Sequence, residues 1–431
     1  MEPLSLATIA FAICFFGLIS GRAERSPLTA PLFFTAIGVG MSGLGLGWLG
    51  MDIEGEVVQG LAELTLVLVL FTDATRIDLT CLRRERALPL RLLALGLPLS
   101  ILFGTAVAIW LFPSISVAEA ALLATILAPT DAALGQAVVS NARVPIRIRQ
   151  TLNVESGLND GIALPLVLVL ASLAGALEEG GDVAYWIQFA LLAVTLGPAV
   201  GAGIGWLGGR LISLSIERKW MSPPFQRIAA LGLSLLAFGG AELIGGNGFI
   251  AAFVAGLILG NTARDVCPCL YDFGEAEGQL LALLVFLIFG AALVPDALAH
   301  VGFAEVGYAL LSLTLIRLLA VAVSLLGSGL RAPSVAFLGW FGPRGLASIL
   351  FILLVVEPGR LESATLLETV VVLTVLLSTV LHGITAYPFA ARYADYAAGA
   401  TDAHEEHRLV DAHPVRIRHV VPADGFTSSP E

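Results

Sequence analysis

Four polar residues stand close together in one apolar segment of the chain. The stretch 151–170, TLNVESGLNDGIALPLVLVL, carries Glu155, Ser156, Asn159 and Asp160 near its start. At 3.6 residues per turn Ser156, Asn159 and Asp160 share one face of a helix, and Glu155 lies beside them. Ionisable groups are costly in lipid, so they turn toward protein or water and commonly carry function. The stretch predicts a membrane-crossing helix; the alternative is a helix that begins in the aqueous interface, with Glu155 as a first-turn acid.

A second acid follows a proline in the preceding apolar segment. AALLATILAPTDAALGQAVV places Pro129, Thr130 and Asp131 in its middle. Only a short basic loop joins this segment to the one that carries Asp160, so the two helices are expected to be neighbours. We therefore expect Asp131, Thr130, Ser156 and Asp160 to converge on one water-accessible cavity.

The predicted cavity has the chemistry of a site for monovalent cations. Carboxylate and hydroxyl oxygens suit Na⁺, Li⁺ or H⁺ much better than a transition metal, which prefers His or thiolate ligands. Two neighbouring carboxylates in a partly dry cavity repel each other when both are ionised, so a proton and a cation compete for the same oxygens. That competition amounts to exchange if the site opens to one side of the membrane at a time.

Arg344 is a cation in the middle of another apolar segment, SVAFLGWFGPRGLASILFILL. A lone arginine in lipid is unfavourable and needs a partner. The first choice is Glu155 and the second is Asp73, in LFTDATRIDL. We expect the pair to brace the site; the alternative is that Arg344 only neutralises a neighbour for packing.

Three other polar residues inside apolar segments give weaker signals. Arg317 is expected to snorkel, to line a cytoplasmic funnel or to contact lipid headgroups. Glu242 is expected near an interface. His382 is expected to be a core histidine with satisfied hydrogen bonds, with titration near neutral pH as the alternative.

The composition requires these residues to be positioned by membrane helices. Of the 431 residues, 57 % are hydrophobic and 13 % are charged, and the mean hydropathy is +0.90, which excludes an ordinary soluble protein. Apolar runs of about 20 residues recur along the chain and predict an all-α, polytopic membrane protein. About thirteen spans are expected, at 5–21, 29–46, 57–75, 88–112, 117–139, 149–174, 185–214, 227–244, 247–262, 277–296, 304–328, 333–356 and 365–391.

The charges of the loops predict the orientation of the chain. Arg and Lys gather in alternate loops and acids in the loops between them, and basic loops face the cytoplasm. The amino terminus is then outside and the carboxyl terminus inside. Residues 1–393 form the membrane domain, and 394–431 form a short polar cytoplasmic tail that carries several His.

Two of the predicted spans are interrupted, at Pro129 and at Gly342–Gly345. Proline removes an amide donor and glycine permits unwinding, and unwound backbone at membrane depth must line a cavity or be buried in protein. The breaks lie seven spans apart, so the two spans run in opposite directions. This pattern predicts two inverted six-helix repeats with two broken crossing helices, the arrangement that surrounds a transporter's midplane site.

At these residues the sequence resembles the monovalent cation/proton antiporter superfamily, in its branch of NhaP-type and animal sodium/proton exchangers. The resemblance covers residues 5–393 and rests on six stretches in the family's order: LTAPLFFTAIGVG, LVLFTDATRIDL, ILAPTDAALGQAVV, VESGLNDGIALPLVL, GFIAAFVAGLILGN and FGPRGLASILF. Two departures are mild: FGPRG differs from the commoner GLRG, and Asp73 stands where many relatives have Glu.

The resemblance implies more than the residues alone. It implies a thirteen-helix inverted-repeat fold in a homodimer, with core and dimerisation helices interleaved along the chain. Asp160 would be the transporting carboxylate, Thr130, Asp131 and Ser156 would help to bind Na⁺, and Asn159 would steady the crossing. An Asn-Asp pair at 159–160 is similar to the electroneutral branch, which implies one cation exchanged for one proton across the plasma membrane, in pH and sodium homeostasis.

Several alternatives stay open at the level of sequence. A K⁺/H⁺ antiporter of the same fold would use the same ligand residues, because selectivity depends on cavity size and field strength. An organic-anion symporter shares the design, but the Asp131 and Asp160 pair argues against an anion. A channel, or a membrane sensor or scaffold without transport, is the remaining alternative. No enzymatic activity, cofactor or nucleic-acid partner is expected; the partners are monovalent cations, protons, lipid and a second copy of the chain.

Overall fold

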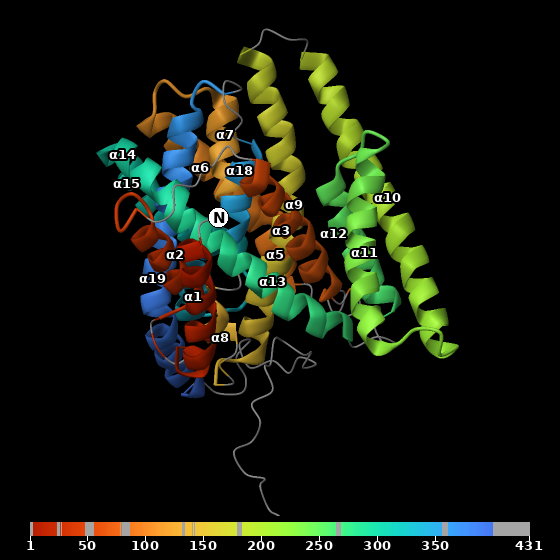
Figure 1. Ribbon diagram of the computed structural model, residues 1–431. Coiled ribbons are helices and arrows are strands. Elements are labelled where there is room, and N and C mark those ends of the chain that lie inside the picture. Colours follow the sequence, from red (N-terminus) through yellow and green to blue (C-terminus); the bar gives the residue numbers. More distant parts are fainter. Residues whose placement is uncertain are drawn as a thin grey trace, which may run out of the picture.

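The computed structural model describes residues 3–23, 26, 28–47, 56–77, 79, 87–131, 134–139, 141, 143–178, 183–263, 269–355 and 361–399. These residues form helices and connecting loops, and no strand occurs among them. Each of the thirteen predicted segments contains helix (Figure 1). The all-α prediction is therefore confirmed, whereas the number of membrane crossings stays a prediction.

The first half of the chain runs through the predicted spans one to seven. Its helices are α1 (Pro3–Ala23), α2 (Ala30–Met41), α3 (Glu56–Thr75), α5 (Ala87–Arg91), α6 (Leu97–Leu111), α7 (Val117–Ile126), α8 (Gln136–Val139), α9 (Ile146–Glu178) and α10 (Val183–Glu217). A π-helical turn, Leu92–Gly96, joins α5 to α6 without a break in the span.

The second half of the chain contains the remaining helices. They are α11 (Pro223–Glu242), α12 (Gly248–Thr262), α13 (Cys269–Ile288), α14 (Val294–His300), α15 (Phe303–Leu311), α16 (Arg317–Ser324), α17 (Ala332–Trp340), α18 (Leu346–Val355) and α19 (Ala364–Ala398). π-Helical turns join α13 to α14 at Phe289–Leu293 and α15 to α16 at Ser312–Ile316. Helix α19 runs five residues into the segment predicted as tail, and residues 400–431 lie outside the described residues.

Seven of the described helical segments are long and apolar enough to cross a membrane by themselves, from Pro3–Ala23 to Ala364–Ala398. Four shorter apolar helices, Ala30–Met41, Val117–Ile126, Gly248–Thr262 and Leu346–Val355, accompany them. Two of these four, α7 and α18, are the halves of spans that the sequence predicts to be interrupted. A multi-pass membrane protein fits both sets.

Both predicted breaks are present. Helix α7 begins at a capping box of Ser116 and Glu119 and ends at Ile126, three residues before Pro129. Helix α17 ends at Trp340, and the backbone is not helical until Leu346. Pro129 and Pro343, which cannot donate a helical hydrogen bond, both lie where the preceding helix has ended.

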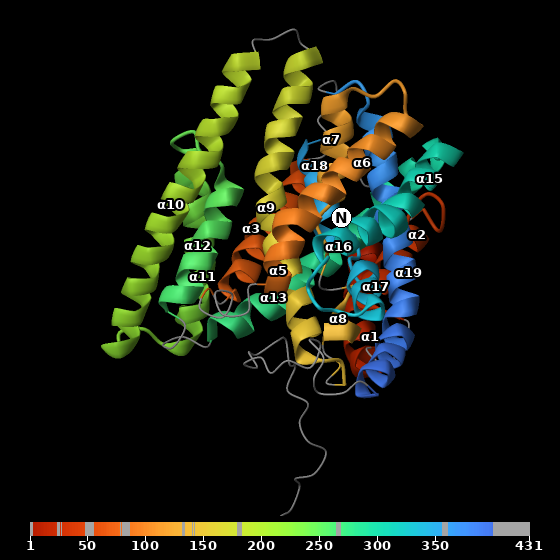
Figure 2. The same ribbon diagram turned by 180° about the vertical axis from the view of Figure 1, so that it is seen from behind.

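Helices α10, α11 and α12 lie side by side at one edge of the molecule, and α12 continues the packing onto α3 (Figures 1 and 2). Glycines make this contact close. A Cβ on Gly201 or Gly205 of α10 would overlap the backbone of α12 at Ala251 or Ala255. Gly256 and Gly260, on α12, meet the backbone of α3 in the same way. Small residues allow such close approach between helices in lipid.

Candidate ion-binding site

The two breaks meet and complete each other's hydrogen bonds. Asp131 N donates to Pro343 O at 2.8 Å, and Leu346 N donates to Asp131 Oδ2 at 2.8 Å. The Asp131 carboxylate thus accepts from the first amide of α18, as a capping side chain does at a helix start. Ser348 Oγ donates to Ile126 O at 2.8 Å, across to the end of α7. The predicted crossing of two broken helices is therefore present as a hydrogen-bonded unit.

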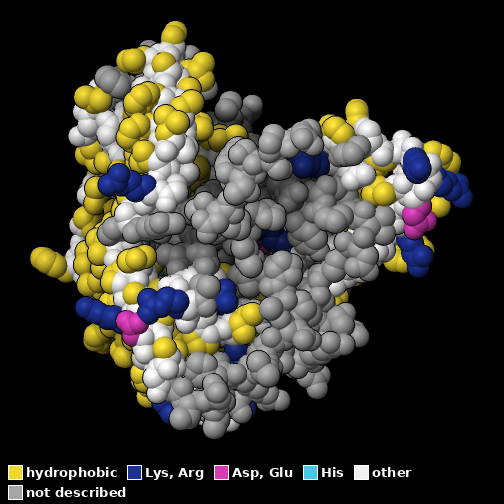
Figure 3. All heavy atoms as spheres, turned by 90° about the horizontal axis from the view of Figure 1, so that it is seen from below, with side chains coloured by type: hydrophobic (Ala, Val, Ile, Leu, Met, Phe, Trp, Pro, Cys, Tyr) yellow, Lys and Arg dark blue, Asp and Glu magenta, His cyan; other side chains and the backbone are white. Residues whose placement is uncertain are grey.

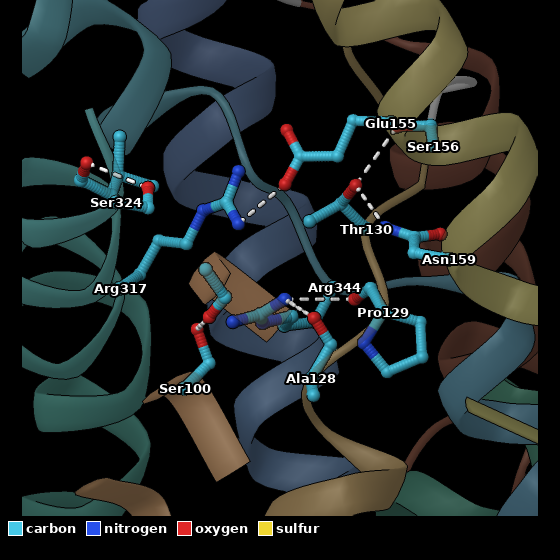
Figure 4. Close-up of polar contacts among 12 residues, drawn as sticks. Ser100, Ala128, Pro129, Thr130, Glu155, Ser156, Asn159, Arg317, Ser324 and Arg344 are labelled. Atoms are coloured by element: carbon cyan, nitrogen blue, oxygen red, sulfur yellow. Dashed lines mark hydrogen bonds and ion pairs between the residues drawn. The ribbon is translucent and has the colours of Figure 1, made fainter. Parts of the chain in front are cut away.

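Arg344, in the second break, donates hydrogen bonds to the backbone of the first break. Its side chain is buried, at 1 % exposure, and its Nη1 donates to Ala128 O and, at 2.8 Å, to Pro129 O (Figure 4). Both carbonyls belong to backbone that follows the end of α7, where helical partners are missing. The guanidinium therefore replaces helical hydrogen bonds. These two hydrogen bonds explain how a buried arginine is accommodated at the break.

Three polar side chains form a cluster where the first break meets α9. Thr130 Oγ1 lies 2.9 Å from Ser156 Oγ, and Asn159 Nδ2 donates to Thr130 Oγ1 at 2.7 Å. Figure 4 shows Thr130 between the other two. Since Asn159 donates to this oxygen, the Thr130 hydroxyl is free to donate onward to Ser156. The structure thus brings Thr130 and Ser156 together, as predicted from the short loop between their segments, and adds Asn159 to the contact.

Asp160 follows this cluster on α9. Its Oδ1 is buried, and no hydrogen-bond partner for that atom occurs among the described residues. The charges of Asp73 and Asp131 act on its carboxylate, so three acids from three segments of the chain lie within electrostatic range of one another. A buried carboxylate oxygen without a donor is costly and is the kind of atom that a bare cation or a proton would satisfy.

The predicted ion pair between Arg344 and Glu155 is wrong. Glu155 Oε1 instead lies 2.6 Å from Arg317 Nη1, and the two side chains are 4 % and 2 % exposed (Figure 4). The second choice, Asp73, has its Oδ1 3.9 Å from Arg76 Nη1. Arg317 therefore neither snorkels nor faces lipid.

Space beside the second break explains why Arg317 reaches Glu155. The Arg317 guanidinium packs against Gly342, where a Cβ would overlap its Nε. A charged residue in the middle of an apolar span was the signal for this role, but the sequence does not show on which side of α16 the acid lies. Of the other weak candidates, Glu242 accepts from Gly248 N at 2.7 Å at the start of α12, and His382 is buried with both ring nitrogens in contact with oxygen atoms.

Comparison with known proteins places this geometry in a family context. Residues 9–392 match the family described as "Sodium/hydrogen exchanger, transmembrane". The K⁺/H⁺ antiporter NhaP of Alkalimonas amylolytica is 26 % identical over 358 residues, which are 82 % of this chain and 61 % of that protein. The K⁺/H⁺ antiporter NhaP2 of Shewanella sp. (strain MR-4) is 25 % identical over 85 % of this chain and 63 % of its own length. This chain thus spans less than two thirds of the length of these two relatives.

A third relative and a solved structure complete the comparison. The Na⁺/H⁺ antiporter NhaS2 of Synechocystis sp. is 28 % identical over 184 residues, 42 % of this chain and 33 % of that protein. The structure of the sodium proton antiporter MjNhaP1 from Methanocaldococcus jannaschii superposes with a TM-score of 0.75 at 19 % identity, covering 91 % of this chain and 99 % of that one. At that identity the likeness concerns the fold.

Proposed function

Because this chain belongs to the sodium/hydrogen exchanger family, we propose that it exchanges Na⁺ or Li⁺ for H⁺ across a membrane by alternating access. The observation that carries the proposal is the buried, unpartnered Oδ1 of Asp160 beside the Thr130–Ser156–Asn159 cluster. Asp160 is the transporting carboxylate. Thr130, Asp131 and Ser156 supply further oxygen ligands, and Asn159 holds the Thr130 hydroxyl in place.

Exchange follows from competition at this site. A proton on Asp160 and a cation at Asp160 satisfy the same buried oxygen, and the two cannot occupy it together. If the site faces one side of the membrane at a time, release of one species must precede binding of the other. The Glu155–Arg317 pair and Arg344 brace the crossing, since neither arginine donates to the Thr130–Ser156–Asn159 cluster.

K⁺ is the alternative cation, and a specific observation favours it. The NhaP and NhaP2 relatives described above, which align with most of this chain, are named K⁺/H⁺ antiporters, whereas NhaS2 and MjNhaP1 are named for sodium. Oxygen ligands of the same kind serve either ion, because cavity size and field strength decide selectivity. A sensor or scaffold without transport is the less favoured alternative, since it gives the open carboxylate no task.

The orientation and assembly belong to the same proposal. Seen from below in Figure 3, the described surface shows Lys and Arg at several places and few acids, and α10 ends at this face, just before Arg218 and Lys219. A basic face supports a cytoplasmic side, with the carboxyl terminus inside and the amino terminus outside a plasma membrane. A homodimer, with core and dimerisation helices interleaved in residues 1–393, is proposed from the family.

Proton flux in everted membrane vesicles tests the proposal and selects the cation. Na⁺, Li⁺ or K⁺ is added in turn between pH 6 and pH 9, and the pH gradient is followed by fluorescence dequenching for wild type and for Asp160→Asn. Dequenching with Na⁺ or Li⁺ that is lost in Asp160→Asn is the expected result. Dequenching with K⁺ alone selects the alternative, and flux that survives in Asp160→Asn contradicts the role of that carboxylate.

A further inference from the structure

Helix α19 presents a row of side chains to the second break. Four residues on one of its faces, at i, i+4, i+7 and i+11, form what we name the α19 stripe: Ser378, His382, Thr385 and Phe389. Thr385 Oγ1 accepts from Trp340 Nε1 at 3.0 Å, and the ring centroid of Phe389 lies 5.7 Å from that of Trp340. The stripe therefore grips the last residue of α17.

The His382 side chain contacts the backbone of the same residue, Trp340. The His382 ring is 1 % exposed, and its Nε2 lies 2.9 Å from Trp340 O. Its ring also packs on the Trp340 ring, with centroids 5.3 Å apart. Trp340 ends α17, so no amide of a following turn reaches its carbonyl in the helical pattern. Two groups donate to the Trp340 carbonyl in place of that amide. One is Nε2–H of His382, and the other is the Gly342 amide, at 2.9 Å.

Ser378 holds the other end of the break. Its Oγ accepts from Arg344 N at 2.7 Å and lies 3.2 Å from His382 Nδ1. Nδ1 also lies 3.0 Å from Ser378 O, so each ring nitrogen contacts a carbonyl oxygen. We assign the ring proton to Nε2, which leaves Nδ1 to accept from the Ser378 hydroxyl. One relay then runs from Arg344 N–H through Ser378 Oγ–H to His382 and on to Trp340 O, and it spans the whole non-helical segment.

We propose that His382 and Ser378 are positioning residues for the cation site, an inference that rests on the proposed function. The backbone that they fix runs from Trp340 to Arg344. The Arg344 side chain then donates to Pro129 O, and two residues later Leu346 N donates to Asp131 Oδ2. The relay thus sets the place of Asp131 without touching the ion. Losing it leaves the binding geometry only fractionally populated, which weakens apparent affinity by that fraction.

The test measures the cation KM and kcat of proton exchange in proteoliposomes for four variants. Ser378→Ala removes the acceptor for Arg344 N, and His382→Leu removes both ring nitrogens. We expect each to raise the cation KM about three- to tenfold, the range of one hydrogen bond, with kcat little changed. His382→Gln retains a donor that can reach Trp340 O and should stay within about twofold of wild type.

Thr379→Val is the matched control. Thr379 is the buried neighbour of Ser378 on α19, and its hydroxyl donates at 2.8 Å to Val375 O within the same helix. Removing that hydroxyl should leave KM unchanged. If His382→Leu does not fold, Ser378→Ala decides the question, because it removes a single oxygen atom.

The outcomes separate the two proposals. Normal exchange by wild type with an unchanged KM in Ser378→Ala contradicts the positioning role and leaves the proposed function standing. A KM that rises equally in His382→Gln, His382→Leu and Thr379→Val also contradicts it, since a general packing defect would explain all three. Absence of cation-driven flux in wild type contradicts the proposed function and this inference with it.

Discussion

Individual oxygen atoms at the crossing differ in what they still lack. Thr130 Oγ1 already has two hydrogen-bond partners, Ser156 and Asn159, whereas Asp160 Oδ1 has no hydrogen-bond partner among the described residues. The Thr130 hydroxyl is therefore held in place before any ion arrives, whereas the side-chain oxygens Asp160 Oδ1 and Asn159 Oδ1 still lack a hydrogen-bond partner among the described residues. Such prior ordering lowers the cost of binding, because few side chains have to be immobilised.

Thr130 gives a direct test of this ordering. Thr130→Val keeps the shape of the side chain but leaves Ser156 Oγ and Asn159 Nδ2 without their shared partner, whereas Thr130→Ser keeps the hydroxyl. We expect Thr130→Val to raise the cation KM about tenfold and Thr130→Ser to change it little. Concentration dependence of cation-driven proton flux measures both. Equal KM values in the two variants would remove Thr130 from the site.

Both side chains of the Arg317–Glu155 pair are buried, so a single substitution should lower the stability of the fold strongly. Glu155→Leu leaves a buried guanidinium without its carboxylate, which typically costs about 3–5 kcal/mol. Arg317→Met leaves the converse charge. We expect each single variant to lower the Tm of the purified protein strongly, and the double variant to recover part of the loss. Thermal unfolding of all three in detergent measures the coupling; strictly additive losses would argue against the pair.

The sequence predicts which residues are costly but not how they pair. Ser156, Asn159 and Asp160 were found because i, i+3 and i+4 spacing on one helix fixes a shared face. Thr130 was placed beside them because a short loop joins its segment to that helix. The partner of Glu155 was missed because Arg317 and Arg344 are far from it in sequence, and helix rotation decides which one reaches it. The open space at Gly342 that admits Arg317 is a property of the assembled helices.

At the scale of helices, the two breaks were predictable from composition and their union was not. Proline alone does not end a helix, since Pro165, Pro198 and Pro388 lie inside α9, α10 and α19. At Pro129 the following polar residues, and at Pro343 the flanking glycines, are the additional signals that indicate the interruptions. Hydrogen bonds from one break to the other depend on antiparallel placement of two segments 215 residues apart. Boundaries were less well predicted: the span predicted to reach residue 46 ends at Met41, because a turn follows that needs the positive φ of Gly47.

The close contact between α10 and α12 makes a prediction at this scale. A Cβ on Gly201 would press on the backbone of Ala251, whereas one on Gly203, two residues along, meets nothing within 4 Å. Gly201→Ala should cost about 1–3 kcal/mol through overpacking and lower the yield and Tm of folded protein. Gly203→Ala should be neutral or slightly stabilising. Size-exclusion profiles and thermal unfolding compare the two; equal behaviour would show that the contact tolerates a methyl group.

For the whole molecule, the resemblance of the Asn159–Asp160 pair to the electroneutral branch implies how much charge the proposed exchange moves in one cycle. Asn159 is neutral and bound to Thr130, so Asp160 is the one titratable group of this pair. Under the proposed function one proton then leaves for each monovalent cation that enters, and no net charge moves. The prediction is that an imposed membrane potential leaves the exchange rate in proteoliposomes unchanged. A rate that follows the potential would require a second proton or an unequal ratio.

The hydrogen bond from Asp131 N to Pro343 O, together with the cap that Asp131 supplies to α18, has a consequence for anyone who recombines this protein with a relative. Neither broken segment satisfies its backbone hydrogen bonds by itself, because each supplies partners to the other. A chimaera that imports only residues 126–131 would meet a foreign counterpart at 342–348. Both segments should be exchanged as one cassette, even though more than two hundred residues separate them along the gene.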